Sequence, residues 1–387
     1  MREAMWSGAV NATPRQTQTE GRKGAATRGG TRILGPLAAS SRAAGLGSLA
    51  ERFETLAAWL DDDLQALESA LGEARAERRE EPFDTLARRA ARHLLDQPGK
   101  RVRPLCVLLA SRLGEVPPAS RAVRDLAAAA ELAHAATLLH DDVIDLGDER
   151  RGASTARVLY GNPASVLGGD HVLVDALRRV DRAGVPGAMT ELIDVIDRMV
   201  AAEALQLERR GAADLCEPEE AQIAWRRVAD GKTGALFAWA LRAGGRAANL
   251  PDAAVERLGA FGALLGEAFQ LADDALDLDG DPALTGKDAF ADLREGKPTW
   301  PIAFAVARDP SLGAALREVA QQPPHAVEPA TLLALRDRIL RTGAVPATWR
   351  QAEAAAERAV ALLQEFPNGP ARDALVAVVR AAARRSH

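Results

Sequence analysis

The sequence predicts an all-α protein, built as a single large helical bundle around a central cavity. From about residue 49 onward, the good helix formers Ala, Leu, Arg and Glu dominate the chain. Proline and glycine separate segments of roughly 15 to 30 residues, which is long for globular helices and typical of bundles. The alternation of β-branched and polar residues that marks half-buried strands is missing from the sequence.

The helix breakers divide this bundle into its expected elements, in order along the chain. A helix is expected on either side of each break, because glycine and proline interrupt the helical hydrogen-bond ladder. The breaks lie at residues 97–99, 116–118, 161–163, 184–187, 244–245, 281–282, 323–324 and 368–370. Since they follow no fixed period, we expect one domain rather than a solenoid of repeats.

Residues 1–45 differ in composition from the rest of the chain. Gly, Thr, Ser and Ala dominate there, and arginine outnumbers the acidic residues. Such a segment cannot bury enough apolar surface to order itself. We therefore expect a disordered Arg/Gly/Ser/Thr-rich tail over 1–45 and an all-α domain over 46–387. An organelle transit peptide has a similar composition, but this segment shows no clear amphipathic face.

Composition excludes several classes of protein. The chain has 387 residues, 47% of them hydrophobic, which is enough to fill one large core. The formal net charge of −5 does not favour nucleic acid as a partner. No run of eighteen uncharged apolar residues occurs, so we expect no transmembrane segment. Cys106 and Cys216 form no CxxC pair, which indicates buried thiols in a reducing cytoplasm rather than disulfides or a zinc cluster.

The segment 121–145 predicts a buried helix with one polar stripe. Apolar residues cover nearly every side of it, whereas His134, Thr137, Asp141 and Asp145 share a single helical face. Asp141 and Asp145 repel each other one turn apart unless a cation lies between them. Two carboxylates on one face, with no thiolate nearby, suit a hard cation such as Mg²⁺.

A second apolar helix, at residues 258–279, carries a similar acidic face. Its polar residues are Gln270, Asp273, Asp274 and Asp277. One such motif alone would be read as a solvated helix end. Two of them, both on hydrophobic helices, predict facing Mg²⁺ sites that bind a diphosphate, because Mg²⁺ commonly completes its coordination with phosphate oxygens.

Lysine is rare in this chain, and its placement is informative. Only five of the 49 basic residues are lysines, and four of these directly follow a glycine: Lys100, Lys232, Lys287 and Lys297. A P-loop is excluded, because no glycine lies five residues before Gly231 or Gly296. Compact ammonium groups near the acidic helices would neutralise the oxygens of a metal-bound diphosphate. Arg150 and Arg151, which follow the first acidic motif, could also bind phosphate oxygens, or they could close a helix at the surface.

These motifs resemble those of the trans-isoprenyl diphosphate synthases, or polyprenyl synthetases. The resemblance covers roughly residues 85 to 310. It rests on the two aspartate-rich motifs at 139–145 and 269–277, the GKRVRP element at 99–104 and the DLREGKPT element at 292–299. It implies the isoprenoid synthase fold and an Mg²⁺-dependent prenyltransferase. Such an enzyme joins an allylic diphosphate head-to-tail to isopentenyl diphosphate and releases an all-trans polyprenyl diphosphate.

The resemblance also implies a role for each matching residue. Asp141, Asp145 and Asp273 would hold Mg²⁺, with Asp142, Asp274 and Asp277 in support, and three ions would be present with the diphosphate. The allylic diphosphate would be bound by Arg150, Lys232, Thr233, Gln270, Lys287 and Lys297. Isopentenyl diphosphate would be bound by Lys100, Arg103, His134 and Arg151. Asp141, Asp145, Lys232 and Asp273 would carry the catalysis, in a homodimer whose product can partition into membranes.

The product length is expected to depend on the residues upstream of Asp141. Ala133, Ala136 and Thr137 are small, and each helical turn rises about 5.4 Å, close to one isoprene unit. A growing chain that runs along this helix meets no aromatic side chain there. We therefore expect a product of C20 or longer, with C30 to C50 favoured, unless a facing helix stops the chain earlier.

Two other functions fit part of this pattern. A class I terpene cyclase shares the all-α fold and metal-triggered ionisation, but it needs no second diphosphate site. A non-catalytic subunit of a heteromeric prenyl synthase is the other alternative. Such subunits tend to lose aspartates or lysines from the motifs, and the sequence retains them.

Overall fold

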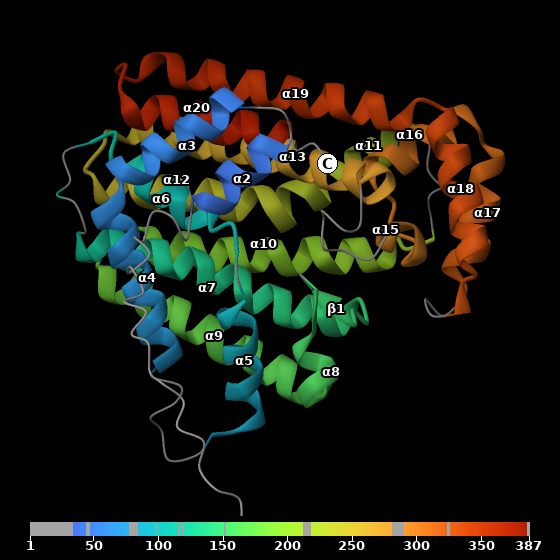
Figure 1. Cartoon of the computed structure of the whole chain (residues 1–387), viewed down its shortest axis with the longest axis horizontal. Helices are drawn as coiled ribbons and strands as arrows, with labels where there is room; N and C mark the ends of the chain where they lie inside the picture. The colour runs from blue at the N-terminus through green and yellow to red at the C-terminus, as the bar shows by residue number, and fades with distance from the viewer. Residues whose placement is uncertain are drawn as a thin grey trace, which may run out of the picture.

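The computed structural model describes residues 34–43, 47–76, 84–97, 99–114, 117, 120–150, 152–211, 218–280, 290–322 and 326–384. Within these ranges the chain is almost entirely helical, as predicted (Figure 1). The first half contains α2 (Gly35–Ala43), α3 (Gly47–Trp59), α4 (Asp61–Ala76), α5 (Leu86–Asp96), α6 (Val102–Ser111), α7 (Arg121–Ile144), β1 (Glu149–Arg150), β2 (Ala153–Ser154), α8 (Ala156–Tyr160) and α9 (Asn162–Ala183). The second half contains α10 (Ala188–Glu208), α11 (Pro218–Ala229), η1 (Asp230–Gly234), α12 (Ala235–Ala247), α13 (Asp252–Asp279), α15 (Ala291–Arg294), α16 (Trp300–Arg308), α17 (Ser311–Ala320), α18 (Pro329–Arg341), α19 (Ala344–Leu362), η3 (Leu363–Glu365) and α20 (Pro370–Ala383).

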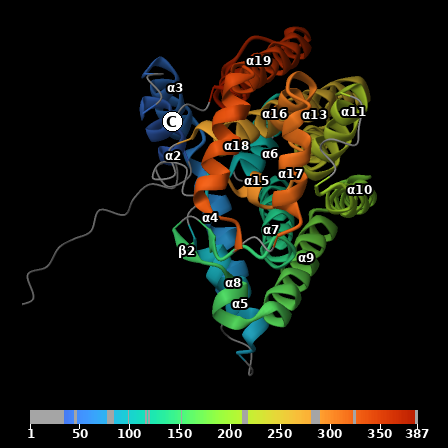
Figure 2. The same ribbon diagram turned by 90° about the vertical axis from the view of Figure 1, so that its right-hand side faces the viewer.

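Helix α7 lies in the interior of the bundle. Figures 1 and 2 place it between α9 on one side and α12 and α13 on the other. Its side chains are buried on nearly every face between Val123 and Leu139, as the apolar cover of this segment predicts. The core continues through α6 and α12, and α19 and α20 close the bundle over α13. A smaller apolar cluster lies beneath α15 to α18, beyond the end of α13.

Most of the predicted breaks separate helices, but residues 244–245 do not. Helix α12 continues through Gly244 and Gly245 to Ala247. A Cβ atom at Gly244 would lie only 2.4 Å from the backbone oxygen of Val107 in α6. These glycines therefore allow two helices to approach closely, which stabilises them inside α12 despite their low helix propensity.

The predicted tail, residues 1–45, lies mostly outside the described residues. Its described part is residues 34–43, where α2 packs on α3. Leu34 and Ala38 are buried there, one helical turn apart. Ordered structure is thus described before residue 46, where the all-α domain was expected to start.

A π-helical turn positions the residues around Lys232. The segment η1, Asp230–Gly234, joins α11 to α12 without a loop and contains the glycine–lysine pair. It packs against α13 so closely that a Cβ atom at Gly266 would lie 2.5 Å from the Cα atom of Gly234. Single π-helical turns inside α-helices often occur at functional sites, because they turn side chains away from the regular helical faces.

No helix in the described part of the chain combines the length and the hydropathy needed to cross a bilayer.

A short antiparallel ribbon follows α7, and it pairs Glu149 with Ser154 and Arg150 with Ala153. This ribbon turns the chain back toward the acidic end of α7 and so brings Arg150 close to that end.

Candidate active site

The first acidic motif lies at the C-terminal end of α7. Asp141 is in its last turn, and Asp145 caps it, with its backbone N–H donating to the Asp141 carbonyl oxygen over 2.8 Å. Both side chains are half-buried, and Asp142 is only 3% exposed. The C-terminal end of a helix carries partial negative charge, so carboxylates gathered there require nearby cations.

Two lysines from distant segments supply that positive charge. Lys232 of η1 places its Nζ atom 3.7 Å from Oδ2 of Asp141 and donates a hydrogen bond to Gln206 over 3.1 Å. Lys297, in the turn after α15, donates to Oδ2 of Asp145 over 2.8 Å. Two of the four lysines that the sequence singled out therefore lie directly against the first acidic motif.

Further charged residues complete this cluster. Helix α10 provides Glu203, which pairs with Lys232, and its following turn provides Arg210, which pairs with Asp145. Glu295 lies 2.5 Å from the Lys297 ammonium. Sequence reasoning missed all three residues. Glu203, Gln206 and Arg210 recur at helical spacing, so a polar stripe on one face of α10 was the available signal.

The surroundings of these groups change their pKa values in opposite directions. Burial raises the pKa of Asp141 to about 6, although Lys232 opposes this. Burial also disfavours ionisation of Asp145, but the Lys297 ammonium outweighs it and lowers the pKa of that carboxyl. The pKa of Lys297 is raised, since its acidic neighbours outweigh the cost of burying its charge. Both lysines are therefore held in the charged form at neutral pH.

Arg150 holds the third carboxylate of the motif. Its Nε and Nη2 atoms donate to Oδ1 of Asp142 over 3.0 and 2.8 Å. The ribbon formed by β1 and β2 positions this guanidinium. The Asp142 carboxylate is thereby held by a side chain of the protein itself.

The second acidic motif lies near the end of α13, and its aspartates differ in environment. Asp274 is 1% exposed and accepts hydrogen bonds from the indole N–H of Trp225 over 2.7 Å and the backbone N–H of Trp300 over 3.3 Å. Burial raises its pKa to about 7. Asp277 accepts from the backbone N–H groups of Ala291 and Asp292 over 3.1 and 3.3 Å. Asp273 is half-buried.

Two connections bring the acidic motifs to the same end of the bundle. The Thr233 hydroxyl donates to Gln270 over 2.9 Å, and the Gln270 amide donates to Asp274 over 2.8 Å. The second connection is the segment 290–299, which contacts Asp277 through its backbone and Asp145 through Lys297. In Figure 1, α15 of this segment lies between the levels of α13 and α7.

Two of the four residues expected to bind isopentenyl diphosphate, Arg103 and His134, lie on α6 and α7. The Arg103 guanidinium stacks 4.6 Å from the ring centroid of Phe237, and that ring packs against Phe269 at 5.7 Å. Phe269 precedes Gln270, so Arg103 is close to the second motif. His134 is half-buried two turns before Asp141, and Lys100 is exposed just before α6.

Five predicted positions remain to be placed. Ala133 and Ala136 are buried on α7, and Thr137 is half-buried, with its hydroxyl donating to the carbonyl oxygen of His134 over 2.8 Å. Arg151 and Lys287 lie outside the described residues.

Among the described residues, no three carboxylate, imidazole or thiol groups lie close enough to hold a metal ion as they stand. Asp141 and Asp145 are each paired with a lysine instead. The cluster thus combines oxygen ligands suited to a hard cation with ammonium groups suited to a phosphate anion.

Comparison with known proteins identifies the family. Residues 84–333 match the model of the family described as polyprenyl synthetase. The chain belongs to the polyprenyl synthetase family. An octaprenyl diphosphate synthase from Escherichia coli is 34% identical over 290 residues, which cover 74% of this chain and 86% of that one. A nonaprenyl diphosphate synthase from Mycobacterium tuberculosis is 36% identical over 291 residues, covering 74% and 83%.

Solved structures of this family have the same fold. A polyprenyl synthase from Caulobacter crescentus, complexed with calcium and isoprenyl diphosphate, is 33% identical, has a TM-score of 0.75, and covers 83% of this chain and 95% of that one. A decaprenyl diphosphate synthase from Rhodobacter capsulatus is 31% identical with a TM-score of 0.75, covering 86% and 98%. These matches confirm the predicted fold and the prenyltransferase activity of the chain, and they favour a synthase over a terpene cyclase.

Proposed function

We propose that this polyprenyl synthetase lengthens an allylic diphosphate with isopentenyl diphosphate in the presence of Mg²⁺ and releases an all-trans product of C20 or longer, with C30 to C50 favoured. One observation carries the assignment of the site. Lys297 donates to Asp145 of the first acidic motif, while the same segment binds Asp277 of the second through its backbone. Carboxylates and an ammonium group for one metal-bound diphosphate thus converge from segments 152 residues apart in the chain.

The surroundings of the six aspartates suggest that three of them position the site and three bind Mg²⁺. Asp142, Asp274 and Asp277 accept hydrogen bonds from protein donors, which supports a positioning role for them. We assign Mg²⁺ binding to Asp141, Asp145 and Asp273, which are half-buried. An all-oxygen ligand set fits Mg²⁺, which usually retains several waters or phosphate oxygens and so needs few protein ligands. In this proposal three Mg²⁺ ions are bound when the diphosphate is present.

The cations of the site would bind the two diphosphates. With Mg²⁺ held by Asp141 and Asp145, the ammonium groups of Lys232 and Lys297 would be available to the phosphate oxygens. The full proposed set for the allylic diphosphate is Arg150, Lys232, Thr233, Gln270, Lys287 and Lys297. The proposed set for isopentenyl diphosphate is Lys100, Arg103, His134 and Arg151.

The reaction breaks the allylic C–O bond and forms one C–C bond. Bound Mg²⁺ supplies Lewis-acid stabilisation of the charge that develops on the departing diphosphate. Lys232 and Lys297 hold that diphosphate in place, and the alkene of isopentenyl diphosphate attacks the allylic cation. A proton leaves the adjacent carbon for the released diphosphate, so the product gains five carbons. The apolar residues of α7 would exclude water that could quench the cation.

A single assay tests this proposal. The purified full-length chain is incubated with farnesyl diphosphate, isopentenyl diphosphate and Mg²⁺, and the products are analysed by mass. We expect products of C20 or longer, abolished by EDTA and by Asp273→Asn. Asp252→Asn, at the exposed start of the same helix α13, is the matched control and should retain activity. Two results would refute the assignment. One is an end product of C15 when a shorter allylic primer replaces farnesyl diphosphate, and the other is full turnover by Asp273→Asn.

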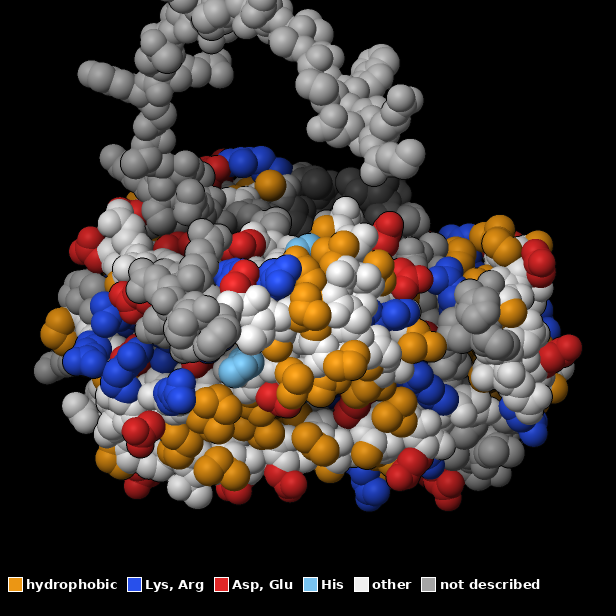
Figure 3. Space-filling view, turned by 90° about the horizontal axis from the view of Figure 1, so that it is seen from below, with side chains coloured by type: hydrophobic (Ala, Val, Ile, Leu, Met, Phe, Trp, Pro, Cys, Tyr) orange, Lys and Arg blue, Asp and Glu red, His pale blue; other side chains and the backbone are white. Residues whose placement is uncertain are grey.

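A homodimer is the assembly that the surface supports. Ile193, Val200 and Leu207 are exposed and spaced by seven on α10, and Leu167 and Val174 repeat this spacing on α9. Figure 3, which looks at the side of the molecule where α9 lies, shows hydrophobic side chains gathered across that face. An apolar face formed by two helices is typical of a dimer interface, since monomers seldom expose such patches.

The dimer is tested by light scattering after gel filtration. The double variant Ile193→Asp/Val200→Asp should run as a monomer, because it places two charges in the proposed interface. Leu333→Asp changes an exposed leucine on α18 and should remain dimeric. A parent chain that is monomeric, or a double variant that stays dimeric, would contradict the proposal.

We also propose a cytoplasmic location for the protein, which cell fractionation would test.

A heteromeric enzyme is the second candidate assembly. A relative from Geobacillus stearothermophilus, 33% identical over 324 residues, is named heptaprenyl diphosphate synthase component 2. The assay above distinguishes the two assemblies. Turnover by the purified chain alone supports the homodimer, whereas activity that requires a second protein supports the heteromeric enzyme.

A further inference from the structure

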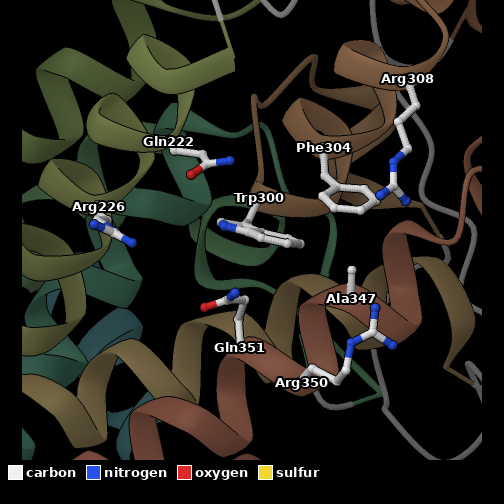
Figure 4. Close-up of a pocket in the computed structure, with 8 residues that line it drawn as sticks. All are labelled: Gln222, Arg226, Trp300, Phe304, Arg308, Ala347, Arg350 and Gln351. Carbon is white, nitrogen blue, oxygen red and sulfur yellow. The ribbon is translucent and has the colours of Figure 1, made fainter.

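A cavity lies on the side of the bundle where α11, α16 and α19 meet (Figure 4). Its volume is about 260 Å³. One wall is aromatic, because Trp300 and Phe304 stack with their ring centroids 5.2 Å apart and their planes inclined by 23°. In Figure 4 both rings border the open space, with Gln351 and Arg350 on the opposite side.

Three helices each contribute an arginine to this cavity. Arg226 comes from α11, Arg308 from α16 and Arg350 from α19. Arg308 is fixed, since it stacks 4.1 Å from the Phe304 ring centroid and donates to the Thr342 carbonyl oxygen over 3.0 Å. None of the eight lining residues is acidic.

The other two arginines are exposed, so solvent reaches their guanidinium groups and a ligand could replace that water. In the part of the chain that the structure describes, neither Arg226 nor Arg350 has an ion-pair or side-chain hydrogen-bond partner. The same is true of the side-chain amides of Gln222 and Gln351, within the same ranges. Four polar side chains thus surround an aromatic wall with donors that the folded chain does not use.

We propose that this cavity binds a small, flat aromatic carboxylate. Its ring would stack on the Trp300 indole, because planar π-systems associate by offset stacking. Its carboxylate would accept hydrogen bonds from Arg226 and Arg350, whose guanidinium groups match carboxylate geometry. Pockets for small ligands have this composition, an apolar wall with a few convergent polar groups, and a volume of about 260 Å³ holds one or two fused rings.

The residues that line this cavity differ from those of the acidic motifs. None of the residues that line the cavity belongs to the metal or diphosphate sets assigned above. The two sites touch at one point, where the Trp300 backbone N–H donates to Asp274 over 3.3 Å. The inference therefore stands whether or not the proposed catalytic assignment holds.

The test is calorimetric titration of the full-length chain with 2-naphthoate, up to about 1 mM. We expect saturable binding that the double variant Arg226→Gln/Arg350→Gln weakens by about tenfold or more, because it removes both charge-assisted partners. The neutral analogue 2-naphthalenemethanol should bind more weakly by a similar factor. Arg227→Gln, an exposed neighbour on α11 outside the lining set, is the matched control and should bind like the parent.

Three results would overturn the proposal. The first is the absence of saturable binding in the parent chain. The second is equal affinity in the parent and in the double variant, which would place the ligand elsewhere. The third is displacement of 2-naphthoate by inorganic pyrophosphate with Mg²⁺, which would show that the ligand occupies the diphosphate site instead.

Discussion

The buried Asp274 carboxyl gives a pH dependence of stability that can be measured without substrate. Its pKa in the folded chain is about 7, because burial disfavours the carboxylate, while its ordinary value is 3.8. The folded state therefore binds a proton more tightly than the unfolded state. The stabilisation is complete below the unfolded pKa and is lost as the pH rises through about 7.

The size of the effect follows from these two values. Lowering the pH from about 7.5 to about 5.5 protonates Asp274 in the folded chain only, which stabilises that state by about 2 kcal/mol. Asp141, with a pKa of about 6, contributes in the same direction by about 1 kcal/mol. The metal-free chain should therefore be more stable at the lower pH by about 3 kcal/mol.

Substitution of Asp274 by asparagine isolates its share. The asparagine oxygen can still accept from Trp225 and Trp300, and its amide can face Gln270, whose own amide can turn to present its oxygen. Because asparagine does not titrate, the gain at low pH should fall by about 2 kcal/mol. The control Asp252→Asn, an exposed position on the same helix, should keep the full gain.

Urea unfolding in EDTA, followed by circular dichroism at one fixed protein concentration, measures these free energies. The decisive quantity is the change between about pH 7.5 and about pH 5.5, compared between the parent and Asp274→Asn. An equal gain in the two proteins would show that another group takes up the proton. A smaller stability of the parent at the lower pH would show that the sign of the argument is wrong.

Three further predictions concern activity. Lys297→Gln should lower kcat by about 100-fold, since it removes a half-buried cation at the proposed diphosphate site. A kcat near that of the parent in steady-state kinetics would contradict this. Below about pH 6, half-maximal activity should need more Mg²⁺, because the Asp141 carboxyl must lose its proton to bind the ion; a Mg²⁺ requirement that stays constant down to about pH 5 argues against Asp141 as a ligand. Thr137→Phe should shorten the product by one or more isoprene units in the mass assay, because an aromatic ring one turn above Asp141 would block the proposed path of the chain, and unchanged product masses would place that path elsewhere.

The local patterns of the sequence were sufficient for the fold class and for the two acidic motifs. Helical periodicity is a property of neighbouring residues, so the buried helix around Asp141 and the acidic face of α13 could be read directly. The predicted helix break at residues 244–245 was wrong because of tertiary packing. Gly244 packs against α6 and Gly245 against Leu258 of α13, and propensity alone does not include those contacts.

The partner of each carboxylate was decided only by the tertiary structure. Asp273 and Asp274 are adjacent in sequence and identical in chemistry, yet the second is buried against Trp225 and Trp300 while the first is half-buried. Likewise, Glu203 and Arg210 show no motif, and they enter the site because α10 packs against η1. The sequence by itself determined which residues could carry charge and on which helical faces they lie, because both depend on residue type and local spacing. The packing of α7, α10, α13 and the segment 290–299 determined which charges meet, because electrostatic energy depends on distances between segments far apart in the chain.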